Sequence, residues 1–145
     1  DFLMKKLLGI VVLGLLWCNV AEAQITFSKC SGLEPNYNYN SSWTVDLERG
    51  TIKQKTHGET SFWLINQNYG DTIVSTTPWI ESTDSRTELL RSYYDAKIML
   101  DLEDETVAVS MEPKFEAPEQ IKKAFKKLVE EGRMKKYVWG SCATE

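Results

Sequence analysis

Two cysteines, Cys30 and Cys142, lie near the two ends of the chain and strongly constrain how it can fold. The third cysteine, Cys18, falls in a segment that we expect to be removed. In an oxidising compartment, two thiols without Cys-x-x-Cys spacing form a structural disulfide rather than a redox-active pair. We predict a Cys30–Cys142 bond with Cα atoms about 5.5 to 6 Å apart. It would place the first and last elements side by side and stabilise the fold by about 4 to 5 kcal/mol.

The first two dozen residues have the pattern of a secretory signal peptide. Met4-Lys5-Lys6 precede an apolar run over residues 7–18, and Ala21-Glu22-Ala23 fits a small-x-small cleavage site. We expect residues 1–3 to lie upstream of the native start and residues 24–145 to form a single domain. The apolar run is shorter than the about 18 to 20 residues of a membrane span, so we expect a soluble periplasmic or extracellular protein. An uncleaved anchor and lipidation at Cys18 are the alternatives.

The pattern after residue 23 is mainly that of β-strands. Trp43, Val45 and Leu47 alternate with polar residues, as one buried sheet face requires. Further strands are predicted over residues 51–55, 61–67 and 72–77, separated by turns at 49–50, 56–59 and 68–71. Residues 78–87 are predicted to form the longest loop.

A hairpin and one helix complete the prediction. Residues 89–102 and 107–112 alternate around a turn at 103–105, which indicates a β-hairpin. Apolar residues at 121, 124, 125, 128 and 129 predict a helix that begins with Pro118 in its first position and ends before Gly132. A last strand, over residues 134–142, reaches Cys142.

Six to eight short strands and one late helix predict a mainly β domain. We expect a curved antiparallel sheet or small barrel, with the helix against one face or mouth. The architecture resembles that of lipocalin-type barrels in export, length, sequential strands, late helix and C-terminal disulfide. The Gly-x-Trp signature of their first strand is missing, because Ser41 stands two residues before Trp43. The resemblance therefore concerns architecture only.

Clusters of residues that could carry chemistry are sparse. His57 is the only histidine and lies in a polar turn, which favours a surface or capping role over that of a general base. One histidine and two bonded cysteines do not suffice for an ordinary zinc site. Asp101, Glu103, Asp104 and Glu105 could offer oxygens to calcium but are more typical of a solvated hairpin tip. No cofactor or metal is implied, and the net charge of −4 argues against a nucleic-acid partner.

Aromatic residues in turns are candidates for contact with a ligand or partner. Alternation already assigns strand aromatics such as Trp43 to the core. The turn aromatics lie among Asn, Asp, Ser and Thr, a composition suited to sugar stacking or protein contact but also found in ordinary turns. They are Tyr37, Tyr39, Tyr69 and Trp79.

The helix offers a second candidate surface. Residues 24–113 contain 7 basic and 14 acidic side chains, whereas residues 114–145 contain 8 and 5. A basic helix face could contact an anionic lipid surface, a polyanionic glycan or an acidic protein. Glu119 and Glu130 share this face and favour an ordinary solvated surface with ion pairs. The basic residues are Lys122, Lys123, Lys126 and Lys127.

We expect a small exported binding module without enzymatic activity. Its ligand would be a small apolar or aromatic molecule in a sheet-lined cavity, or a partner protein. An envelope-associated structural or stress protein that acts through its surface is the alternative. A hydrolase that uses carboxylates such as Asp46, Glu48, Asp71 or Glu88 comes third.

Overall fold

The computed structural model describes residues 24–78 and 85–145. The predicted signal peptide and Trp79 lie outside these described residues. Ten strands form one antiparallel sheet, so the mainly β prediction is confirmed, with more strands than the six to eight expected. The strands are β1 (Gln24–Ser31), β2 (Ser42–Asp46), β3 (Thr51–Thr56), β4 (Glu59–Leu64), β5 (Gln67–Asn68), β6 (Thr72–Ser75), β7 (Thr77–Pro78), β8 (Tyr94–Asp101), β9 (Thr106–Pro113) and β10 (Tyr137–Thr144).

The sheet curls into a half-barrel. Its strand order is β5-β6-β8-β9-β10-β1-β2-β3-β4-β7, so the first and last strands of the chain are neighbours in its middle. β6 pairs with β8 and β7 pairs with β4, yet only Thr76 separates β6 from β7 along the chain. Thr76 therefore links strands that lie near the two opposite ends of the sheet order.

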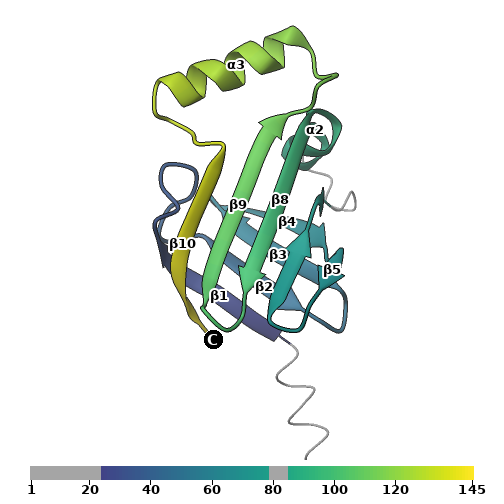
Figure 1. Cartoon of the computed structure of the whole chain (residues 1–145), viewed down its shortest axis with the longest axis vertical. Coiled ribbons are helices and arrows are strands. Elements are labelled where there is room, and N and C mark those ends of the chain that lie inside the picture. Colours follow the sequence, from purple (N-terminus) through teal and green to yellow (C-terminus); the bar gives the residue numbers. More distant parts are fainter. Residues whose placement is uncertain (1–23, 79–84) are drawn as a thin grey trace, which may run out of the picture.

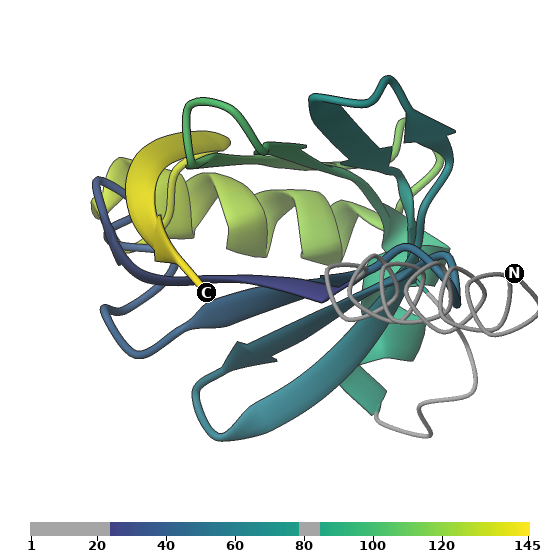
Figure 2. The same ribbon diagram turned by 90° about the horizontal axis from the view of Figure 1, so that it is seen from below.

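Two layers and two helices define the shape. The layer of β8, β9 and β10 faces the layer of β1 to β4 (Figure 2). Helices α2 (Ser85–Tyr93) and α3 (Glu119–Glu130) both lie at one end of the half-barrel, which we call the helix end (Figure 1). The β8–β9 turn lies at the opposite end, the hairpin end. Neither helix of the described residues has the length and apolar character needed to cross a membrane.

Helix α2 was not predicted, since residues 85–87 were assigned to a loop and residues 89–93 to a strand. Both assignments are wrong. Glu88 in the first turn and Arg91 in the last turn suit the helix dipole. The segment does not alternate strictly, and short apolar runs fit a helix as well as a strand. The hairpin strand consequently begins at Tyr94, where α2 ends.

The other predicted elements need smaller corrections. The β8–β9 hairpin is confirmed, with Ile98 opposite Val109. α3 is confirmed, although Pro118 is its N-cap rather than its first residue. β10 begins at residue 137 and continues two residues past Cys142. Leu47 does not join the buried face of β2: it is 38% exposed, because the Asp46 carboxylate accepts a hydrogen bond from the Arg49 backbone N–H and begins a turn.

The predicted disulfide joins Cys30 to Cys142 across β1 and β10. The Cα atoms lie 4.0 Å apart, closer than expected, and the two strands are direct neighbours in the sheet. A bulge between Ser28 and Ser31 contains Lys29 with φ of 52°. The bulge lets both Phe27 and Cys30 reach the buried inner face.

Removal of the disulfide should weaken the whole fold. The Cys30→Ala/Cys142→Ala double variant is expected to lose about 2 to 5 kcal/mol of unfolding free energy, because its unfolded chain is less restricted. Urea denaturation followed by circular dichroism measures this loss. Wild-type protein under reducing conditions should match the double variant. If the urea midpoint of both samples equals that of the oxidised wild type, the disulfide does not stabilise the fold.

Gly140 occupies an inner position of β10 where the chain after β1 passes closely. A Cβ atom there would overlap the Ser31 carbonyl oxygen and lie 3.0 Å from Leu33 Cγ. Gly140→Ala is therefore expected to lower the unfolding free energy by about 1 to 3 kcal/mol in urea denaturation. The control Ser141→Ala, at the exposed neighbouring position, should change it by less than about 0.5 kcal/mol. Equal effects of the two substitutions would refute the packing argument.

Candidate functional site

A cavity of about 180 Å³ lies inside the half-barrel toward the helix end. Side chains from both layers line it, together with Leu90 of α2 and Met134 of the segment between α3 and β10. The hairpin end of the interior is instead filled with apolar side chains, including Phe27, Ile52 and Leu100. The interior therefore combines a packed core with a hollow.

The cavity arises from the sizes of the inward-facing residues. Along β8, the inner face carries Leu100 and Ile98 in the core but only Ala96 beside the cavity. Along β4, the buried Trp63 is followed toward the helix end by Ser61, which lies opposite Gln54 of β3. At Ala96 of β8 and Ser61 of β4, a small residue thus takes the place of a large apolar one beside the cavity.

Two residues in the cavity wall carry buried polar atoms without a hydrogen-bond partner among the described residues. The atoms are Oε1 of Gln54 and Nε1 of Trp63. Gln54 is 5% exposed and Trp63 is 3% exposed. A third such atom, Trp43 Nε1, belongs to a side chain outside the lining. Buried polar groups in proteins are nearly always paired, so two unpaired atoms beside one cavity call for an explanation.

Of the four turn aromatics that were predicted as site residues, Tyr37 lines the cavity. Its ring meets that of Trp43 edge-on, with centroids 5.1 Å apart. Tyr39 is 59% exposed and Tyr69 is 64% exposed. Tyr69 precedes Thr72, which pairs with Asp101 at the hairpin end, so it is far along the half-barrel from the cavity. Trp79 lies outside the described residues.

Sequence reasoning did not find most of the cavity lining. Gln54, Ser61, Ala96, Met111 and Met134 were not singled out. The available signal was the interruption of an apolar inner face by a polar or small residue, as at Gln54 two positions after Ile52. This pattern identifies cavity-lining residues only when the register of the neighbouring strands is known.

Tyr94 connects the cavity to the helix end. Its ring packs 5.9 Å from that of Phe125, the buried residue of α3. Burial raises the pKa of the Tyr94 hydroxyl above its ordinary value of 10.0, because the charged phenolate loses hydration. Tyr94 also borders a hollow on the outer face of the sheet, so it lies between the inner cavity and this outer hollow.

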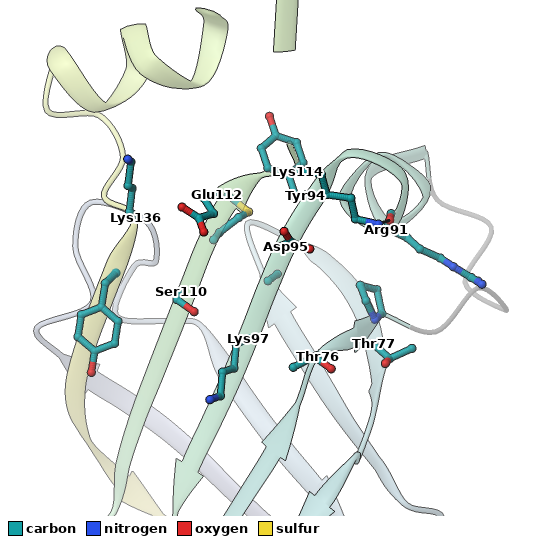
Figure 3. A pocket seen from close by; sticks show the side chains of 14 residues that line it. Thr76, Thr77, Arg91, Tyr94, Asp95, Lys97, Ser110, Glu112, Lys114 and Lys136 are labelled. Carbon is teal, nitrogen blue, oxygen red and sulfur yellow. Dashed lines mark hydrogen bonds between the residues drawn. The ribbon is translucent and has the colours of Figure 1, made fainter. Parts of the chain in front are cut away.

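Figure 3 shows this outer hollow, of about 580 Å³, on β8, β9 and β10. Asp95 and Glu112 face each other across the β8–β9 pair, with Lys97 and Lys136 beside them. Both carboxylates are exposed to solvent. The carboxylates predicted for a hydrolase do not converge on one element. Asp46 ends β2, Glu48 lies in the next turn, Asp71 precedes β6 and Glu88 lies on α2.

The basic face of α3 is largely engaged in local contacts. Lys122 pairs with Glu119 at 3.7 Å and lies 5.2 Å from the centre of the Phe115 ring. Lys126 and Lys127 approach Glu130 and Glu131, each at 4.0 Å. Exposed pairs at these spacings contribute little to stability, and they partly neutralise the face.

The remaining predicted sites lie in exposed turns. The Asp101 carboxylate accepts hydrogen bonds from the backbone N–H groups of Glu103 and Asp104, at 3.0 and 2.9 Å. Within residues 24–78 and 85–145, no three His, Cys, Asp or Glu side chains are grouped to hold a metal ion. His57 occupies the exposed β3–β4 turn, with φ of 51°.

No known family, curated protein or solved structure matches this chain. The cavity with its unpaired polar atoms is the strongest candidate site on geometry alone.

Tyr94 should make the fold sensitive to alkali. The raised pKa means that Tyr94 stabilises the folded state below about pH 10 and that this contribution is lost as the pH rises through the folded-state pKa. Tyr94→Phe should therefore lose less unfolding free energy than wild type between pH 8 and pH about 11. Urea denaturation at both pH values measures the difference. Identical losses would show that Tyr94 ionises equally in the folded and unfolded states.

Proposed function

We propose that this protein is a small exported binding module whose ligand occupies the cavity at the helix end. The supporting observation is the cavity itself, which is walled by Trp63, Tyr94, Met111 and other side chains of both layers. An engineered protein cavity of about 150 Å³ binds benzene. A cavity of about 180 Å³ thus suits one ring or a short aliphatic chain.

The lining favours an uncharged ligand. Among the described lining residues, Glu59 is the one that is charged at neutral pH, and it lies at an exposed position of β4. The rest of the wall consists of apolar side chains, hydroxyl-bearing side chains and two amides. Burying a charge without a partner is far more costly than burying an apolar ring. A neutral, mainly apolar molecule is therefore the best match.

The proposed setting is the periplasm or the outside of the cell. The Cys30–Cys142 disulfide supports this proposal, because such bonds persist in oxidising compartments. The curled sheet with an interior cavity also supports the lipocalin-like architecture that we propose. In barrels of that type the ligand enters the interior from one end.

Toluene tests the proposed function. We expect saturable shifts of the Ala96 and Ser61 amide signals in ¹H–¹⁵N NMR during a toluene titration, because both residues line the cavity. Ala96→Phe should abolish the shifts by filling the space. The matched control Ala143→Phe, at an exposed position of β10, should retain them. Toluene shifts that persist in Ala96→Phe, or that are absent from wild type, would refute binding in this cavity.

A partner protein is a second candidate, favoured by the outer face of β10. Tyr137 is 58% exposed and Trp139 is 54% exposed on this face. In the strand register, Ala108 lies between Trp139 and Met99, which is 37% exposed. Exposed aromatic and apolar residues in one row are typical of contact surfaces.

A further inference from the structure

The unpaired polar atoms in the cavity wall indicate what the ligand carries. Gln54 Oε1 and Trp63 Nε1 are buried in the wall without a hydrogen-bond partner among the described side chains and backbone. Leaving such a group unpaired costs about 1 to 3 kcal/mol. A ligand that satisfies both atoms would recover much of this cost on binding.

The two side chains are placed to act together. In the β3–β4 pair, Gln54 lies opposite Ser61, and Trp63 is the next inward-facing residue of β4. Gln54 and Trp63 are therefore diagonal neighbours on the inner face, within reach of one another through long side chains. The indole N–H can only donate, whereas the amide oxygen can only accept. The wall thus holds one donor and one acceptor beside the same space. Both atoms are covered in this structure, with less than 1 Å² accessible each, so a ligand in the cavity reaches them through a rotation of the two side chains.

We infer that the ligand is a neutral, one-ring compound with a hydroxyl or carboxamide group. This inference rests on the proposed function. The group accepts a hydrogen bond from Trp63 Nε1–H and donates one to Gln54 Oε1. An ether or ketone would satisfy Trp63 alone and an ammonium would satisfy Gln54 alone. A carboxylate would bring a charge without a cationic partner among the described lining residues.

Phenol and toluene form a matched pair for testing this inference, because they differ by a hydroxyl in place of a methyl group. We expect wild type to bind phenol about 10-fold more tightly than toluene in NMR titrations, as a gain of about 1.4 kcal/mol implies. Gln54→Leu and Trp63→Phe should each weaken phenol binding about 10-fold and leave toluene binding within about 2-fold. Toluene serves as the internal control for any change in cavity shape.

Anisole provides a test that needs no substitution. It accepts a hydrogen bond but cannot donate one, so it should bind wild type more weakly than phenol. The inference is overturned if wild type binds phenol no more tightly than toluene and anisole. That result is expected if a water molecule bridges Gln54 and Trp63, or if Gln54 turns toward Trp43. The inference is also overturned if folded variants weaken phenol and toluene equally. If none of the three compounds binds, the proposed function itself fails.

Discussion

The pairing of β1 with β10 brings together segments 112 residues apart, and the Cys30–Cys142 bond fixes that contact covalently. Closing so long a loop costs conformational entropy, which the bond reduces by restricting the unfolded chain. Phe27 of β1, buried in the core, lies opposite Thr144 of β10 at this seam. Because β10 also pairs with β9, the seam holds the layer of β8 to β10 over the layer of β1 to β4. The cavity lies between these layers and depends on their staying together.

The inner surface of the half-barrel is packed near one end and hollow near the other. Near the hairpin end, Ile98 lies opposite Val109 and Leu100 opposite Val107, and these side chains fill the space. Nearer the helix end, Ala96 lies opposite Met111 and leaves a cavity. Unfilled space and the unpaired amide of Gln54 both lower stability, so this end is not arranged for stability alone. Such local costs are expected where a protein binds something that relieves them.

The sequence determines some parts of this structure locally and others only through pairing. The β8–β9 hairpin, α3 and the disulfide could be predicted because alternation, helical spacing and a single possible pairing each suffice. Helix α2 was missed because residues 85–93 lack a clear apolar period, although Ser85 and Glu88 have the spacing of an N-terminal capping box. Gln54 was hidden for another reason: whether its side chain faces the core depends on the register with β2 and β4, which no local pattern contains. Tyr37 was predicted as a contact residue because it is an aromatic residue in a turn. In the structure it lines the cavity, since the chain after β1 folds back over the half-barrel.

Exposed charges at the two ends of the half-barrel have little influence on the cavity itself. Asp101 and Glu105 lie at the hairpin end, whereas Lys122 and Lys126 lie on α3 at the other end. Fields from exposed charges decay over about 8 Å at physiological ionic strength. A neutral molecule gains no net attraction from either end. The selectivity that we propose for the cavity would therefore come from contacts within it, where the low dielectric strengthens each hydrogen bond and makes each unpaired atom costly. Within the described wall, Gln54 and Trp63 are the residues that meet this condition.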